Sequence, residues 1–214
     1  SHRSEAGGGR LNNNFTHMLS IATHVIGDTI LALNGEVRND MGKAPMVDGV
    51  HNFKTRRDFI PEDINDTKLL WSETDLECSY TVLAQLESRR PASKPVSVLF
   101  RHGGLQPTFN EDHIVFYGSK SAIYIKGHYG SGPLYLYGDN GEWKEVPLPE
   151  EIALKVPDIE DDTQRNWTCM IQEFIRDIEG KPFEPYPTFR EGSLYQQIID
   201  LIRKNDRWVD VSQL

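Results

Sequence analysis

Very short linkers between apolar segments restrict the topology of this chain more than any other feature of its sequence. Residues 114–117 and 122–125 are separated by four residues, and residues 134–137 and 143–146 by five. Parallel neighbours in a sheet need a crossover connection of about a dozen residues or more, usually a helix. Each pair of segments therefore predicts an antiparallel hairpin.

Three further segments predict strands. In residues 78–86 and 96–101, aromatic or apolar residues alternate with others. Residues 29–33 form an apolar run followed by a turn or bulge at Asn34-Gly35. Such alternation indicates a sheet that is covered on one face, so the other face, rich in tyrosine, is a candidate partner surface.

Residues 39–74 interrupt this pattern and predict a long excursion with little regular structure. Within it, Lys54, Arg56 and Arg57 suit either a solvated surface or a contact with an anionic group.

Helical spacing of apolar residues appears at both ends of the chain. After the triglycine at 7–9 a helix is predicted, and Gly27 is expected to end it with a positive φ. The expected apolar face of this helix consists of Leu11, Met18, Leu19, Ala22, Val25 and Ile26. A second helix is predicted from a capping pair at Asp161 and Gln164 to a stop at Gly180, and a third near 191–204.

The order of these elements predicts the fold class. A helix and a strand are followed by hairpins and then by two helices, which is typical of an α+β fold with helices packed on one face of a largely antiparallel open sheet. We expect a single domain over residues 1–214, in which residues 1–6 are a tag or an inter-domain remnant.

The composition excludes several classes of partner. The formal net charge is −9, whereas nonspecific binding to nucleic acid or to an anionic membrane needs a basic surface. No apolar stretch approaches the ~20 residues of a membrane span, and the chain opens on polar residues rather than a signal peptide. Cys78 and Cys169 lack metal or redox spacing, which favours free thiols in a reducing compartment. We therefore expect a cytoplasmic protein.

Polar residues form one stripe on the first predicted helix. Asn13 and His17 are four residues apart, and Ser20 and His24 continue the same side. The stripe suits either a solvated helix face or a ligand site. The triglycine favours a site, because glycine lets the backbone approach a ligand closely and a titratable histidine follows one to two turns later.

This stretch resembles the start of the C-terminal domain of the glucose-fructose oxidoreductase, inositol dehydrogenase and MocA (Gfo/Idh/MocA) family of NAD(P)-dependent oxidoreductases. In that family Gly-Gly-Gly is followed by two or three variable residues, Asp, three residues and His. Here Gly7, Gly8, Gly9 and His17 take those places, and Asn13 replaces the Asp. The resemblance continues through residues 117–121, residues 186–192 and Trp208.

The resemblance implies roles for these residues. His17 would be catalytic, binding a substrate hydroxyl and moving a proton as hydride leaves carbon, a role for which the pKa of imidazole is suited. Asn13 would bind the substrate through hydrogen bonds but, unlike Asp, cannot take a proton. Gly7, Gly8 and Gly9 would lie near the nicotinamide ring of the cofactor.

Other candidate residues come from the pattern alone. Arg101 and His102 lie at the end of a predicted strand and are candidates for substrate binding. A metal site is not expected, because His17 and His24 have no partnering carboxylate nearby in the sequence.

The chain lacks the strand, glycine-rich turn and helix that bind a dinucleotide pyrophosphate. In the family, an N-terminal Rossmann domain with a Glu-Lys-Pro motif and its catalytic Lys precedes the triglycine. We therefore expect this chain to be the C-terminal part of a longer protein that binds NAD or NADP. By itself it is expected to bind neither and to be inactive.

Two functions follow from the resemblance. The first is a sugar or polyol oxidoreductase, to which this chain contributes substrate-binding residues and contacts for a homodimer or higher oligomer through the open sheet face. The alternative is a non-catalytic dinucleotide-sensing regulator or interaction domain, since the family includes galactose-pathway repressors. An intact catalytic Lys in the whole protein would favour the first.

Overall fold

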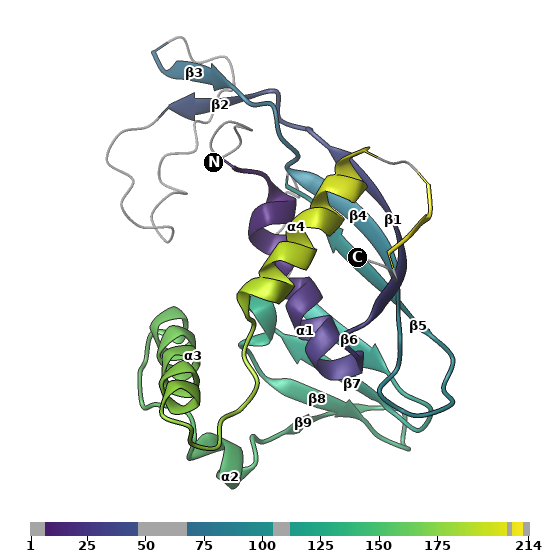
Figure 1. Ribbon diagram of the computed structural model, residues 1–214, viewed down its shortest axis with the longest axis vertical. Coiled ribbons are helices and arrows are strands. Elements are labelled where there is room, and N and C mark those ends of the chain that lie inside the picture. Colours follow the sequence, from purple (N-terminus) through teal and green to yellow (C-terminus); the bar gives the residue numbers. More distant parts are fainter. Residues whose placement is uncertain (1–6, 47–67, 105–111, 205–206, 212–214) are drawn as a thin grey trace. The chain divides into compact units, whose positions relative to one another are not determined.

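A computed structural model of the protein describes residues 7–46, 68–104, 112–204 and 207–211 (Figure 1). The chain forms two compact units, one from residues 1–107 and 192–214 and one from residues 108–191. The single domain over residues 1–214 stays a prediction, because two compact units can still belong to one domain.

The first unit is built on a four-stranded antiparallel sheet in the order β10–β1–β4–β5. Its strands are β1 (Ile30–Arg38), β4 (Ser79–Leu86), β5 (Val96–His102) and β10 (Val209–Asp210). In β4, Tyr80, Val82, Ala84 and Leu86 are buried, whereas Thr81 and Leu83 are exposed. The strands predicted at 78–86 and 96–101 are thus confirmed.

Two helical segments cover the buried face of this sheet (Figure 1). The first begins with a π-helix, η2 (Leu11–Phe15), and continues as α1 (Thr16–Ile26). The second is α4 (Phe189–Lys204). The Thr23 and Tyr195 hydroxyls, 3.1 Å apart, form a buried hydrogen bond between α1 and α4. The core between helices and sheet contains Leu11, Phe15, Leu19, Leu33, Val82, Leu86, Phe100, Ile198, Ile199 and Ile202.

The apolar face of the first helix differs from the predicted one at two residues. Phe15, which the spacing did not select, is 1% exposed, and Val25, which it did select, is 51% exposed. The π turn explains the difference at Phe15, because its wider turn changes which residues of the first helical segment face the sheet.

Two glycines serve close packing instead of turns. Gly27 ends α1 as predicted, but its φ of 160° belongs to extended backbone, so the left-handed conformation expected of a helix stop is wrong. A Cβ atom there would lie 2.1 Å from the carbonyl oxygen of Glu87, and the close approach requires glycine. The predicted turn or bulge at Asn34-Gly35 is also wrong, because both residues lie inside β1 and pair in regular register with Leu83 and Val82 of β4.

The excursion predicted at 39–74 contains some regular structure. β2 (Lys43–Met46) and β3 (Leu70–Glu73) pair as an antiparallel two-stranded sheet. Lys54, Arg56 and Arg57 lie outside the described residues.

The second unit contains an antiparallel sheet in the order β6–β7–β8–β9. β6 (His113–Tyr117) pairs with β7 (Ala122–Lys126), and β8 (Leu134–Tyr137) pairs with β9 (Trp143–Val146), so both predicted hairpins are confirmed. Also in this unit are a short 3-10 turn, η4 (His128–Gly130), and the helices α2 (Glu150–Ala153) and α3 (Asp162–Ile178).

Helix α3 has the predicted ends. The Asp161 carboxylate accepts from the Gln164 backbone N–H at 2.9 Å, as an N-cap. At the other end Gly180 has a φ of 66°, and the Gly180 and Lys181 N–H groups donate to the carbonyls of Asp177 and Arg176, which is a Schellman motif. Its apolar stripe is exposed rather than packed on a sheet, at Trp167, Met170, Ile171, Phe174, Ile175 and Ile178.

The predicted α+β class with antiparallel strands is confirmed. The described strands are divided among three sheets, a division that the periodicity of each strand does not reveal. Within the described parts of the chain, each helix is too short or too polar to cross a membrane.

Candidate functional site

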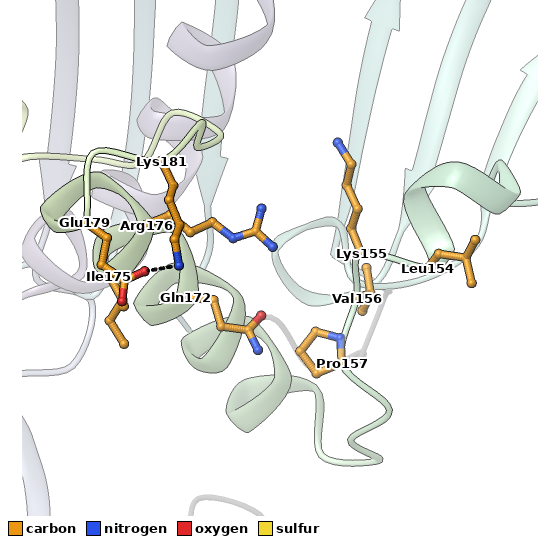
Figure 2. A pocket seen from close by; sticks show the side chains of 9 residues that line it. All are labelled: Leu154, Lys155, Val156, Pro157, Gln172, Ile175, Arg176, Glu179 and Lys181. Atoms are coloured by element: carbon orange, nitrogen blue, oxygen red, sulfur yellow. Dashed lines mark ion pairs between the residues drawn. The ribbon is translucent and has the colours of Figure 1, made fainter.

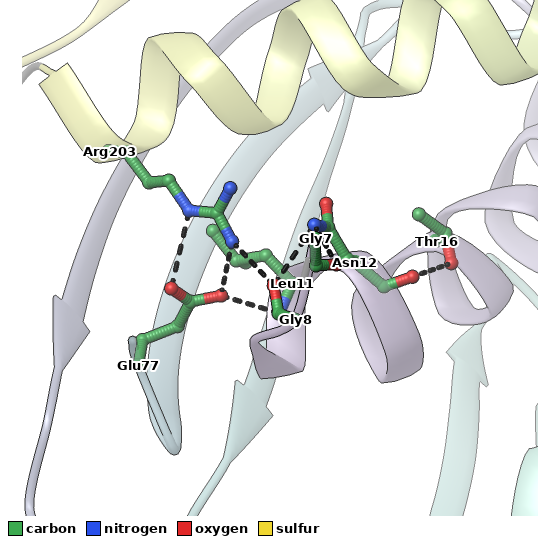
Figure 3. Close-up of polar contacts among 7 residues, drawn as sticks. All are labelled: Gly7, Gly8, Leu11, Asn12, Thr16, Glu77 and Arg203. Atoms are coloured by element: carbon green, nitrogen blue, oxygen red, sulfur yellow. Dashed lines mark hydrogen bonds and ion pairs between the residues drawn. The ribbon is translucent and has the colours of Figure 1, made fainter. Parts of the chain in front are cut away.

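The start of the first helix is attached to the sheet and to α4 through one carboxylate. Glu77, 4% exposed and just before β4, accepts from the Leu11 backbone N–H at 3.0 Å. It also forms an ion pair with Arg203, at 2.9 Å from Nη2 and 3.2 Å from Nε. Figure 3 shows the guanidinium of Arg203 bridging Glu77 and the Gly8 carbonyl, to which it donates at 3.3 Å.

The triglycine packs against this ion pair. A Cβ atom at Gly9 would lie 2.3 Å from Glu77 Oε1 and 2.7 Å from Arg203 Nη2. Gly7 and Gly9 have φ values of 64° and 100°, which favour glycine. Packing and backbone conformation therefore account for glycine at Gly9, and backbone conformation alone at Gly7, where a Cβ atom would meet nothing within 4 Å. The cofactor contact of Gly7, Gly8 and Gly9 stays a prediction.

Several polar groups of the π turn that follows form hydrogen bonds within the turn or to the triglycine. The Thr16 N–H donates to the Leu11 carbonyl, and the Thr16 hydroxyl donates to the Asn12 carbonyl at 3.2 Å. The Asn12 amide in turn donates to the carbonyls of Gly7 and Gly8 at 2.9 and 3.0 Å. The backbone between the triglycine and α1 is therefore held by hydrogen bonds along its length (Figure 3).

Asn13 and His17 are both exposed, on a side of the helix away from the core. Their neighbour Asn14 points inward, is 9% exposed, and accepts a hydrogen bond from the Tyr80 hydroxyl. Exposure fits either alternative for the polar stripe, so the catalytic role of His17 and the substrate role of Asn13 stay predictions.

The side chains of Arg101 and His102 lie on opposite faces of the sheet. Successive residues of a strand point to opposite faces of its sheet. His102 lies on the face of β5 that also carries Phe100, and its ring stacks on Tyr80 with centroids 5.7 Å apart. Arg101 is exposed on the opposite face. Of the two, only His102 is linked, through Tyr80 and Asn14, to the helix start.

Four residues of this region were not predicted from the sequence. Glu77, Arg203, Asn14 and Tyr80 hold the start of the helix, and their contacts join residues 66 to 195 positions apart in the chain. A short-range pattern offers no signal for such partners. Among the residues that the structure describes, no group of three His, Cys, Asp or Glu side chains is placed to hold a metal ion.

The second unit contains an open groove of about 650 Å³ between residues 154–157 and the last turns of α3 (Figure 2). Its two lysines are paired with carboxylates. Lys155 lies 2.7 Å from Glu184, and Lys181 lies 2.7 Å from Glu179. The hydrogen bond and the charge of Glu184 raise the pKa of Lys155. Among the described residues that line this groove there is no Ser, Thr, Cys or His, so the helix start of the first unit is the better candidate site.

The architecture is that of Gfo/Idh/MocA-type NAD-binding oxidoreductases, and the resemblance seen in the sequence is confirmed at the level of the fold. The transcriptional regulator Gal80p from Kluyveromyces lactis shares it, with a TM-score of 0.65 and 19% identity over 99% of this chain and 50% of that chain. Levoglucosan dehydrogenase in its apo form matches with a TM-score of 0.62 and 18% identity, over 98% of this chain and 52% of that one.

An NAD-binding oxidoreductase from Klebsiella pneumoniae matches with a TM-score of 0.60 and 14% identity, over 92% and 49% of the two chains. The present chain thus spans about half the length of these structures. No protein-family model and no curated protein matches its sequence.

Proposed function

We propose that this chain is the substrate-binding and oligomerisation part of an NAD(P)-dependent oxidoreductase that acts on a sugar or a polyol. The observation that carries the proposal is the exposure of Asn13 and His17 on a helix whose first turn is fixed to the sheet by Glu77 and Tyr80. A polyhydroxylated substrate on this side of the helix has an amide and an imidazole within one turn of each other.

The structural neighbours support the substrate class. A structure of levoglucosan dehydrogenase contains NADH and L-sorbose, a cofactor and a sugar. This similarity is one of fold alone. That a sugar or polyol is also the substrate of the present protein is therefore our proposal.

The chemistry assigned to this chain is proton transfer and orientation. Oxidation of an alcohol removes a hydride from carbon and a proton from oxygen, and His17 would accept that proton as a general base. Asn13 would orient the hydroxyl, its amide donating to or accepting from oxygen without taking a proton. The nicotinamide of NAD(P), when bound, supplies the hydride acceptor.

The residues present fit the substrate side better than the dinucleotide. The described residues contain no strand, glycine-rich turn and helix that could hold a pyrophosphate. The Gly8 carbonyl is already bonded to Arg203 and Asn12. We therefore infer that another domain of the whole protein binds NAD or NADP.

A second candidate is a dinucleotide-sensing regulator without turnover. Asn13 favours it, because an amide in place of the family's Asp removes one ionisable group beside His17. The likeness to Gal80p, whose structure is described as that of a transcriptional regulator, is in keeping with the same role.

One assay separates the two candidates. The whole protein that carries this chain is incubated with a panel of sugars and polyols and with NAD or NADP, and formation of reduced nicotinamide is followed. Turnover with at least one substrate and one cofactor is the expected result. Dinucleotide binding without turnover across the panel would instead favour the regulator.

A further inference from the structure

The carboxylate of Glu77 is the group from outside the helix that bonds to its first turn. The Glu77 Oε1 atom accepts from the Leu11 N–H at 3.0 Å, and the backbone carbonyl of Glu77 accepts from the Arg10 N–H at 3.1 Å. The first N–H groups of a helix have no partner inside it, so Glu77 supplies the N-terminal cap from a position 66 residues later in the chain.

The charge of this cap is balanced on two sides. A carboxylate is favoured at the positive end of a helix dipole, and Arg203 belongs to the last turn of α4, where a cation is favoured. Burying a carboxylate is costly unless it is paired, and Arg203 binds both of its oxygens while also donating to the Gly8 carbonyl. The ion pair therefore clamps the triglycine and the first turn of the helix together.

The clamped turn affects how the triglycine and Asn13 are oriented relative to His17. A π turn holds one more residue than an α turn, and here it lets the Thr16 N–H reach the Leu11 carbonyl instead of that of Asn12. Each residue of an α-helix turns by about 100°. Conversion of the π turn to an α-helix would rotate the residues before it, among them the triglycine, by about that angle with respect to His17, and would shift Asn13 and Asn14 within the turn by less.

We propose that Glu77, together with Arg203, is a positioning residue: it holds the π turn that sets the orientation of the triglycine and Asn13 relative to His17. Neither residue touches the proposed substrate side directly, since both lie at the buried end of the turn (Figure 3). The catalytic consequence of this role rests on the proposed function, whereas the effect on the π turn does not.

The structural arm uses the chain of residues 1–214. Glu77→Gln keeps the shape of the side chain but removes the charge, and Ile30→Val is the control, a core change at the end of β1 where it pairs with Leu86. For Glu77→Gln we expect the Leu11 amide to exchange with solvent at least about tenfold faster. We also expect the Thr16 N–H to switch its partner to the Asn12 carbonyl, as read from backbone chemical shifts and a crystal structure.

The control should show neither change, although both variants lower the melting temperature. A Glu77→Gln protein that melts earlier but keeps the π turn would overturn the proposal, because the pair would then be a stabilising contact alone. If Glu77→Gln does not fold, Arg203→Lys decides by the same criteria, since an ammonium cannot bridge both carboxylate oxygens and the Gly8 carbonyl in the geometry of a guanidinium.

The functional arm uses the whole protein and its best substrate. Glu77→Gln should lower kcat at least about tenfold with the KM for the cofactor unchanged, and should add little to the loss caused by His17→Ala, because both changes act through one group. Losses that simply add would refute a positioning role through His17. A wild-type protein without turnover would contradict the proposed function, and the structural arm would still decide the role of Glu77.

Discussion

At the scale of single residues, the proposed chemistry depends on His17. Its side chain is exposed, one turn beyond Asn13, and the core of the first unit does not include it. His24 lies seven residues further along the same exposed side, so the helix offers a second imidazole in a similar setting but further from the triglycine.

We predict that His17→Ala in the whole protein lowers turnover by about 10²–10⁴-fold, the usual contribution of a general acid or base. His24→Ala, the matched control, should leave turnover within about twofold. Thermal melts of both variants should stay near the wild type, because an exposed side chain contributes little to the free energy of unfolding. Wild-type turnover in His17→Ala would show that His17 is only a polar residue on a helix.

At the scale of elements, the start of α4 is a capping box. The Thr188 backbone N–H donates to the Glu191 carboxylate at 2.9 Å, and the Thr188 hydroxyl bonds to the same oxygen. The Thr188 hydroxyl oxygen accepts from the Arg190 N–H at 3.2 Å. The hydrogen bond from the Thr188 side chain is the main reason why the pKa of Glu191 lies below its usual value.

We predict that Thr188→Ala lowers the free energy of unfolding by about 1 kcal/mol at neutral pH. A carboxylate with a depressed pKa contributes stability above its unfolded-state pKa and loses it as the pH falls through its folded-state value. The difference in the free energy of unfolding between Thr188→Ala and the wild type should therefore become smaller below roughly pH 4. Urea melts at neutral and acidic pH measure it, with Thr168→Ala in α3 as a control that should show no such narrowing.

Two glycines at helices differ in the space around them, and this difference gives a second prediction. Gly27→Ala places a methyl group 2.1 Å from the Glu87 carbonyl oxygen, whereas Gly192 in α4 has open space where its Cβ would be. Gly27→Ala should lower the free energy of unfolding by roughly 1–3 kcal/mol, and Gly192→Ala should raise it by about 0.5–1 kcal/mol. Denaturant melts of the pair measure both, and equal effects would contradict the packing explanation for Gly27.

At the scale of the whole molecule, the β6–β9 sheet carries aromatic side chains on one face. Tyr124 lies 6.0 Å from Tyr135 and 5.7 Å from Trp143, and Tyr137 lies 5.2 Å from Trp143, measured between ring centroids. Tyr137 and Trp143 are each more than two-fifths exposed. Exposed aromatic clusters of this kind are typical of interfaces.

We predict that the protein forms a dimer through this aromatic face, detectable by sedimentation at ~10–100 μM. Trp143→Lys should shift the population to monomer, because it places a charge in the contact. Leu99→Lys, which puts the same charge on an exposed apolar residue of β5, should leave the dimer intact. A wild-type protein that sediments only as a monomer would contradict the prediction.

The cofactor prediction also concerns the chain as a whole. Titration calorimetry of residues 1–214 with NAD and with NADP should show binding no tighter than ~1 mM. The reason is the missing strand, glycine-rich turn and helix among the described residues. Micromolar binding of either dinucleotide would mean that this chain holds its own cofactor site.

Local patterns in the sequence determined most of the elements. The hairpins at β6–β7 and β8–β9 follow from alternation and short linkers, and α3 follows from helical spacing with a cap at Asp161 and a stop at Gly180. Each of these signals lies within a few residues of the element it predicts. The α+β class could therefore be predicted from these patterns. The likeness to Gfo/Idh/MocA-type structures came instead from the resemblance of the triglycine and His17 to the family motif.

Only the tertiary structure decided how the candidate site is built. The pairing of Glu77 with Arg203 across 126 residues and the contact of Asn14 with Tyr80 join segments that no short pattern relates. The same holds for Gly9, whose neighbours are the charged atoms of that pair. The π turn is local, but it lies between these contacts. A sequence shows which residues could cap or line a site, but the partner of a buried charge depends on which segments the fold brings together.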